Sequence, residues 1–178
     1  MTCDPLPITP HLVLGAAKSG KSSYAERLCA ALPPPRLYIA TARVLDDEMK
    51  DRVRRHRERR RSSWETLEAP LDLVPALEAR QGKHSPVLVD CLTLWLTNLL
   101  LAEPQTALPE HEVARLCAFL AAVEYPLFLV SNEVGAGIVP DNPLARRFRD
   151  LAGFANQEVA SACKAVSFVV AGIPIRVK

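Results

Sequence analysis

The feature that most constrains this chain is a glycine-containing motif near its N-terminus. The segment Gly15–Ser22, with the sequence GAAKSGKS, matches the phosphate-loop pattern G-x-x-x-x-G-K-[ST] at every fixed position. It follows a short apolar run, Leu12–Leu14, and precedes a helical pattern over Lys21–Leu32. This order places backbone N–H groups and a helix N-terminus around an anion, whereas the alternative is an ordinary strand-to-helix turn. The motif predicts an α/β domain that binds a nucleotide.

Each fixed position of the motif has a chemical reason. Gly15 and Gly20 let the backbone approach phosphate oxygens. Lys21 is expected to reach the β- and γ-phosphates, and Ser22 is expected to hold Mg²⁺. A P-loop also needs an acid at the end of a neighbouring strand to hold the metal. Asp90, which ends an apolar run, fits that role, and the alternative is that it caps the helix that follows.

The rest of the chain alternates between apolar strand-like runs and helical patterns. Further strands are predicted at Arg36–Thr41, Pro86–Asp90 and Pro126–Ser131, with a closing strand or hairpin at Ser167–Val177. Further helices are predicted at Asp46–Arg61, Cys91–Leu101, Glu110–Val123 and Asn142–Val166, the last as one helix or two. Because the strands are continuously apolar, we expect a parallel sheet covered on both faces. The predicted class is a three-layer α/β fold, with residues 1–178 as a single domain.

The net charge of +2 conceals one strongly basic segment. Lys50–Arg61 holds eight basic and two acidic residues, a local charge of +6. In the predicted helix, His56 shares a face with Arg52 and Arg60. The cations favour a neutral imidazole, which is a competent nucleophile at phosphorus, and they attract a polyphosphate. The alternatives are a solvated helix face and a nucleic-acid site, but an aromatic content of 6% offers few side chains for base stacking, so no nucleic-acid partner is expected.

The cysteines and the apolar runs favour a cytoplasmic protein. The five cysteines are an odd number without a C-x-x-C pair, so reduced thiols are expected. No basic segment precedes an apolar core at the N-terminus, as a secretory signal requires. The strongest candidate for a membrane span, Val87–Ala102, is interrupted by Asp90 and Asn98 and is shorter than the about 20 residues needed. Three histidines are expected on the surface or in loops: His11, His84 and His111.

Several longer motifs follow one another along the chain. They are YIATA (Tyr38–Ala42), DDEM (Asp46–Met49), R-V-x-x-H (Arg52–His56), WETLEAP (Trp64–Pro70), VLVDCLTLWLTNLL (Val87–Leu100), SNEVGAGIVPDNPLARRFRDLAG (Ser131–Gly153), Asn156-Gln157 and a final VVAGIPIRVK. Together with the phosphate loop they resemble the adenosylcobinamide kinase and guanylyltransferase family of cobalamin synthesis, over about Leu12–Lys178. Ala16 and Lys18 depart from the glycine and arginine expected in many relatives.

The resemblance implies a RecA-like parallel sheet, a homotrimer and two reactions. ATP or GTP would first phosphorylate the aminopropanol hydroxyl of adenosylcobinamide. GTP would then transfer GMP to a histidine with loss of pyrophosphate, and adenosylcobinamide phosphate would capture the GMP to give adenosylcobinamide-GDP. The R-V-x-x-H motif assigns the guanylylated histidine to His56. A rival hypothesis is a P-loop kinase for another small alcohol or nucleotide, which would not need this histidine.

The motifs and the resemblance together indicate the site residues. Lys21 and His56 are the expected catalytic residues, and Ser22 and Asp90 are the expected ligands of Mg²⁺. Nucleotide contacts are expected from Gly15, Ala16, Ala17, Lys18, Ser19, Gly20, Lys21, Ser22, Ala40, Thr41, Ala42, Arg57, Glu58, Arg59, Arg60, Glu68 and Asp90. Glu68 rests on the resemblance alone, and its alternative is a surface carboxylate. The segment Ser131–Pro140 is a strand end and loop that could either face the substrate or serve as a structural turn.

Overall fold

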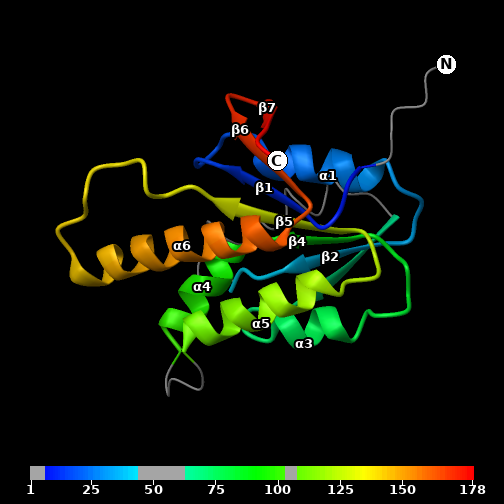
Figure 1. The fold of residues 1–178 in the computed structure, drawn as a ribbon, viewed down its shortest axis with the longest axis horizontal. Coiled ribbons are helices and arrows are strands. Elements are labelled where there is room, and N and C mark those ends of the chain that lie inside the picture. Colours follow the sequence, from blue (N-terminus) through cyan, green and yellow to red (C-terminus); the bar gives the residue numbers. More distant parts are fainter. Residues whose placement is uncertain (1–6, 44–62, 103–107) are drawn as a thin grey trace.

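The computed structural model describes residues 7–43, 63–102 and 108–178, and their strands form one seven-stranded sheet (Figure 1). In spatial order the strands are β3 (Trp64–Glu68), β2 (Arg36–Ala40), β4 (Val87–Asp90), β5 (Leu127–Asn132), β1 (His11–Gly15), β6 (Ala165–Val170) and β7 (Ile173–Arg176). Six strands are parallel, and β7 returns antiparallel to β6. The carboxyl ends of the parallel strands therefore meet at one edge of the sheet.

Helices cover both faces of this sheet. They are α1 (Lys21–Ala30), α3 (Leu73–Glu78), α4 (Leu92–Leu100), α5 (Pro109–Ala121) and α6 (Pro143–Ala162). Among them, α1 packs on one face, and the other four pack on the opposite face (Figure 1). The expected three-layer α/β fold with a mostly parallel sheet is confirmed. The prediction of a single domain includes residues outside the described ranges and stays a prediction.

Successive strand residues supply two separate hydrophobic cores. In β1, Leu12 packs into the core under the four helices, and Val13 packs with Cys29 of α1 on the other face. Trp95 lies at the centre of the larger core, where its indole Nε1 donates a hydrogen bond of 2.9 Å to the carbonyl of Leu71. Because strands of this kind are buried on both sides, they need apolar residues at every position. This explains the continuous apolar runs from which the parallel sheet was predicted.

Two elements differ from the sequence prediction. The edge strand β3 and the short helix α3 were not predicted as elements. All but the first residue of β3 are exposed, so the strand lacks the apolar run that marks β1, β4 and β5. Its backbone instead pairs with β2, from Arg36↔Trp64 to Ala40↔Glu68. The predicted basic helix Asp46–Arg61, with His56, lies outside the described residues.

The helix predicted over Asn142–Val166 is one helix that ends earlier. Asn142 is its N-cap, and Oδ1 of this side chain accepts hydrogen bonds from the backbone N–H groups of Leu144 and Ala145. Cys163, after the last helical residue, has an extended backbone with ψ of 148°. The residues that follow enter β6, so the final apolar residues of the predicted helix belong to the sheet.

The expectation for His11 was wrong. This residue begins β1 and is 5% exposed, with its Nε2 2.9 Å from the hydroxyl of Ser167 in β6. Burial, helped by the nearby charge of Arg176, lowers the pKa of His11 to about 4, so the ring is neutral near pH 7. His84 and His111 are exposed, as expected.

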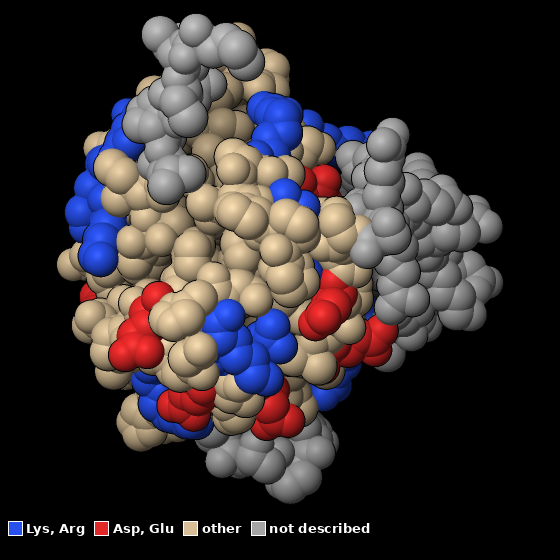
Figure 2. All heavy atoms as spheres, turned by 90° about the vertical axis from the view of Figure 1, so that its right-hand side faces the viewer, with Lys and Arg blue, Asp and Glu red and all other residues tan. Residues whose placement is uncertain are grey.

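Reduced thiols and no membrane-spanning segment were expected from the sequence. The cysteines of the described ranges are free, and Cys29, Cys91 and Cys163 are buried. Within the same ranges, no helix has the length and apolar character needed to cross a membrane. Figure 2 shows the end of the molecule at which the parallel strands begin. Basic and acidic side chains lie beside one another on this visible face.

Candidate nucleotide site

The predicted site residues of the described ranges lie at the carboxyl edge of the sheet. Gly15 ends β1, Asp90 ends β4, and Glu68 ends β3. Ala40, the last residue of β2, is the register partner of both Asp90 and Glu68. Ligands of open α/β sheets bind at this edge, because the loops and helix N-termini that contact them begin here.

The phosphate loop has a backbone shaped by two left-handed residues. Lys18 has a φ of 55° and Gly20 a φ of 94°, and the N–H of Ser19 donates to the carbonyl of Ala16 at 3.2 Å. Ala16 has no positive φ, so it adopts the loop backbone without strain. Lys18 has a left-handed backbone, which an arginine at this position would have as well, so this departure changes the side chain alone. Ala16, Ala17 and Lys18 are exposed. Successive left-handed and right-handed residues of this kind are typical of an anion-binding loop.

Helix α1 begins directly behind this loop. Its N-cap, Gly20, has no side chain that could cap the helix, so the first N–H groups are left to water or to a ligand. Lys21 is 8% exposed, and its Nζ donates to the carbonyl of Ala16 at 3.1 Å, which folds the ammonium over the loop. Ser22 is half-buried in the first helical turn. A single turn therefore combines backbone donors, a cation and a hydroxyl.

The β6–β7 hairpin braces the phosphate loop from outside its own strand and helix. The N–H of Gly172, in the turn of the hairpin, donates to the carbonyl of Ser19 at 2.8 Å. A Cβ added at Gly20 would lie 3.1 Å from the Cα of Gly172, and one added at Gly15 would lie 2.7 Å from the carbonyl of Val169. Both motif glycines are therefore needed for packing against the hairpin as well as for access to phosphate.

Asp90 is placed by a tyrosine on the neighbouring strand. The hydroxyl of Tyr38 donates to Oδ2 of Asp90 at 3.1 Å, and the carboxylate is half-buried. The alternative role for Asp90, capping the next helix, does not hold, because the N-cap of α4 is Cys91. Burial, and next the charge of Asp90, raise the pKa of the Cys91 thiol to about 11, while Lys21 acts in the opposite direction. The charges of Lys21 and Asp90 thus act on the same buried, neutral thiol.

Ala40, Thr41 and Ala42 were predicted to contact the nucleotide, but the side chain of Thr41 forms its hydrogen bonds within the protein. Thr41 is fully buried, and its hydroxyl donates to the carbonyl of Cys91 at 2.7 Å and accepts from the N–H of Cys91 at 2.8 Å. Its own carbonyl accepts from the side chain of Asn98 at 2.7 Å. Thr41 therefore ties the end of β2 to β4 and α4. Ala40 and Ala42 are half-buried beside it.

Glu68 lies far from the phosphate loop along the same edge. It is exposed at the end of β3, and three strands, β2, β4 and β5, lie between β3 and β1. Four strand spacings correspond to about 19 Å. Asp90 therefore lies two strands from the strand of the phosphate loop, whereas Glu68 lies four strands from it. His56, Arg57, Glu58, Arg59 and Arg60 lie outside the described residues.

The structure adds a polar cluster that the sequence analysis missed. Asn132, the last residue of β5, is in register with Gly15, and its Nδ2 donates to the hydroxyl of Thr93 at 2.6 Å. Its carbonyl accepts from the side chain of Asn156 at 3.1 Å, and the next residue, Glu133, donates its N–H to the carbonyl of Gly15 at 3.1 Å. The available signal was a polar residue at the end of the apolar run of β5. Its importance depends on the register with β1, which the sequence does not show.

Comparisons with known proteins agree with this geometry. Residues 11–177 match the family model described as cobinamide kinase / cobinamide phosphate guanyltransferase. The chain is 47% identical over 168 residues to the bifunctional adenosylcobalamin biosynthesis protein CobP of Pseudomonas aeruginosa, covering 94% of this chain and 96% of that protein. It is 40% identical over 179 residues to the bifunctional adenosylcobalamin biosynthesis protein CobU of Salmonella typhimurium, covering 94% of this chain and 98% of that protein.

The chain is also similar to a third relative and to one solved structure. The CobU protein of Escherichia coli is 39% identical over 179 residues, with 94% of this chain and 98% of that protein covered. The solved structure is the P4 protein from bacteriophage phi6 in complex with ADP, with 14% identity, a TM-score of 0.46, and coverage of 92% of this chain and 53% of that chain. On the family match and the three relatives, this chain belongs to the cobinamide kinase / cobinamide phosphate guanyltransferase family, the bifunctional enzymes of adenosylcobalamin biosynthesis.

Proposed function

We propose that this chain phosphorylates adenosylcobinamide with ATP or GTP at the phosphate loop and then transfers GMP from GTP to adenosylcobinamide phosphate through His56. The observation that carries the proposal is that the phosphate loop with Lys21 follows β1 and that Asp90 ends β4 at the same carboxyl edge of the sheet, with β5 between the two strands, in a chain of this family. The expected homotrimer and the cytoplasmic location stay predictions.

In the first reaction, the chain's own groups would bind and orient the triphosphate. The N–H groups of the loop and of the first turn of α1 would hold the phosphate oxygens, and Lys21 would stabilise the charge on the transferred phosphoryl group. The acceptor hydroxyl oxygen would bond to the γ-phosphorus while the bond to the β-phosphate oxygen breaks. Positioning and charge stabilisation supply most of the rate in such reactions.

The residues at this centre fit a magnesium ion that binds together with the nucleotide. Ser22 offers a hydroxyl and Asp90 a half-buried carboxylate, and in the described ranges no three His, Cys, Asp or Glu residues gather as a metal site. Mg²⁺ prefers a few protein oxygens together with substrate phosphates and water. When bound, it would neutralise charge on the phosphate oxygens. We therefore propose Ser22 and Asp90 as its protein ligands.

The second reaction would use a different part of the same edge. In the sequence, His56 belongs to the connection between β2 and β3, and Glu68 ends β3, about four strand spacings from the phosphate loop. This spacing of about 19 Å supports a second nucleotide position near β2 and β3. A P–N bond to His56 would form as pyrophosphate leaves, and the acceptor phosphate oxygen would then replace the imidazole. Splitting the transfer into two steps is the general advantage of a covalent intermediate.

The test is intact-mass measurement of the purified protein with Mg²⁺ and GTP. Wild type should gain one acid-labile GMP, and His56→Ala should gain none. His111→Ala is the matched control, because His111 is exposed in α5 and should leave the adduct unchanged. His56→Ala should still phosphorylate adenosylcobinamide with ATP. Wild type without any adduct would leave a P-loop kinase for another acceptor as the better explanation.

A further inference from the structure

One loop at the carboxyl edge has no role in the chemistry described so far. It comprises Glu133–Asn142 and connects β5 to α6; we refer to it as the β5–α6 loop. It begins beside the phosphate loop, since Asn132 is in register with Gly15 and the N–H of Glu133 donates to the carbonyl of Gly15 at 3.1 Å. The first residue of the loop therefore lies beside the start of the phosphate loop, and the rest of the loop runs outward from this edge of the sheet (Figure 1).

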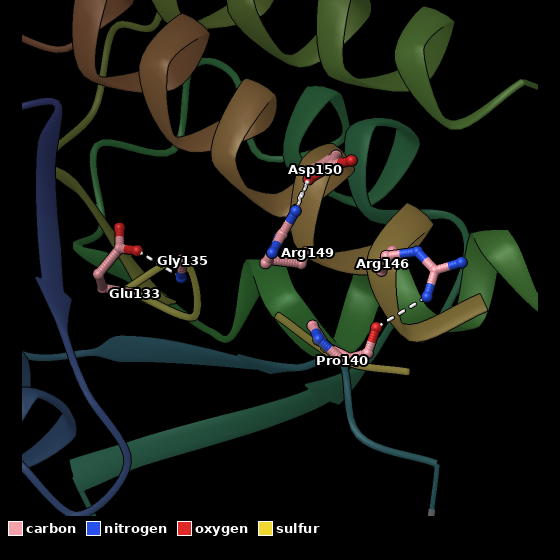
Figure 3. A network of polar contacts seen from close by, with 6 residues as sticks. All are labelled: Glu133, Gly135, Pro140, Arg146, Arg149 and Asp150. Atoms are coloured by element: carbon pink, nitrogen blue, oxygen red, sulfur yellow. Dashed lines mark hydrogen bonds and ion pairs between the residues drawn. The ribbon is translucent and has the colours of Figure 1, made fainter. Parts of the chain in front are cut away.

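Both ends of the β5–α6 loop are fixed by hydrogen bonds (Figure 3). At the first end, Oε1 of Glu133 accepts from the N–H of Gly135 at 2.6 Å. At the second end, Nη1 of Arg146 donates to the carbonyl of Pro140 at 2.8 Å and to that of Asp141 at 2.7 Å. A guanidinium that bridges two successive carbonyls holds this end against the first turn of α6.

The middle of the β5–α6 loop presents apolar side chains to solvent. Ile138 is 96% exposed and Val139 is 57% exposed. Single exposed apolar residues are common, whereas this loop exposes two adjacent ones. Leu144, in the first turn of α6, is also exposed, at 47%. Because the loop begins beside the phosphate loop, we expect a substrate that reaches the triphosphate as the occupant.

A shallow depression lies where α4 ends and α6 begins. It has a volume of about 240 Å³ and is lined mainly by apolar side chains, among them Leu100, Leu101, Leu144 and Phe148. Binding pockets for small molecules are usually about 300 to 1,000 Å³, so a macrocycle cannot be enclosed here. A large acceptor would instead lie across the loop and extend over the depression.

We infer that Ile138 and Val139 of the β5–α6 loop form the contact surface for the corrin macrocycle of the acceptor, with its hydroxyl arm directed to the phosphate loop. The inference rests on the proposed function, because it names the part of the chain that holds the acceptor of the kinase step. The macrocycle offers a broad face with methyl groups, and the loop offers apolar area against which this face can pack. This separates recognition of the acceptor from recognition of the nucleotide.

The experiment is steady-state kinetics of the kinase step with the double variant I138S/V139S. The KM for adenosylcobinamide should rise about tenfold or more, as expected for lost apolar contacts, while the KM for the triphosphate stays within about twofold. The conservative variant I138L/V139I should restore the acceptor KM to near the wild-type value. Leu108→Ser is the matched control, because Leu108 is an exposed apolar residue at the N-cap of α5 and should change neither constant.

Two further measurements separate the possible outcomes. Adduct formation from GTP alone needs no acceptor, so it should be unchanged in I138S/V139S. An unchanged acceptor KM in the double variant would overturn the inference while leaving the proposed function intact. A change in oligomeric state by light scattering would also overturn it, by assigning the pair to a contact between subunits. Wild type without kinase activity on adenosylcobinamide would instead refute the proposed function itself.

Discussion

Two loops that follow neighbouring strands, β1 and β5, are built in opposite ways. The phosphate loop is held along its length. The carbonyl of Ala16 accepts hydrogen bonds from the N–H of Ser19 and from Nζ of the almost buried Lys21, and the hairpin contacts the carbonyl of Ser19. The β5–α6 loop is held at its two ends, and its middle, with Ile138, is exposed. The same edge of one sheet thus carries a rigid loop and an anchored but open one.

The difference follows from what each loop would have to bind. Phosphate oxygens need several donors placed within hydrogen-bond distance, and a small displacement of these donors costs much of the stabilisation. A macrocycle needs apolar area, which tolerates small shifts because hydrophobic contact is not directional. Changes in the phosphate loop should therefore have large effects on rate, and changes in the β5–α6 loop should have moderate effects on the acceptor alone.

The largest effect is expected for Lys21→Ala. Removing a preorganised charge from a phosphoryl-transfer centre should lower kcat/KM of the kinase step about 10²- to 10³-fold. The control is Lys83→Ala, at an exposed position outside the site, which should be close to wild type. Kinetics with saturating adenosylcobinamide measure both. A loss below about fivefold would remove Lys21 from the transfer step and weaken the contrast between the loops.

The second prediction compares one glycine from each loop. Gly20→Ala introduces a side chain at φ of 94° and 3.1 Å from the Cα of Gly172, so it should lower the free energy of unfolding by about 1 to 2 kcal/mol or more. Gly137→Ala meets nothing within 4 Å and no positive φ, so it should be neutral or raise stability by up to about 1 kcal/mol. Denaturant unfolding measures both. Equal losses would mean that the β5–α6 loop is as constrained as the phosphate loop.

The smallest effect is expected for Arg146→Met. The variant keeps the length of the side chain but releases the carbonyls of Pro140 and Asp141, so the loop end should become mobile. The acceptor KM should rise about fivefold, equivalent to about 1 kcal/mol, with kcat nearly unchanged. Arg147→Met, at an exposed neighbouring position, is the control. An equal effect of both variants would point to lost positive charge as the cause, in place of a lost anchor.

Local sequence was enough to predict the elements that carry the phosphate loop. The apolar run of β1, the glycine motif and the helical pattern of α1 agree with one another, and Asp90 stands at the end of another apolar run. Strand β3 could not be predicted in this way, because its residues are mostly exposed and it is defined by pairing with β2. His11 was misplaced for a related reason, since a partner on β6 makes its burial possible.

The candidate site shows the same limit. The motif identifies Lys21 and Ser22, but the brace at Gly172 and the cluster around Asn132 arise where distant segments meet. Ile138 and Val139 lie in a segment that was predicted as a strand end and loop, and the exposure of their side chains is known from the structure alone. The roles of these residues depend on which segments lie next to them in the fold, and a single sequence does not show those neighbours.

The phosphate loop can form its contact with the β6–β7 hairpin only after the hairpin has been synthesised. The motif is synthesised before β6 and the turn at Gly172, so the contact between Gly172 and Ser19 cannot form until this turn has left the ribosome. Domains form as the chain is synthesised from the N-terminus. A nascent chain that has not reached this turn should therefore bind triphosphate weakly, and nucleotide binding would report that the sheet is complete.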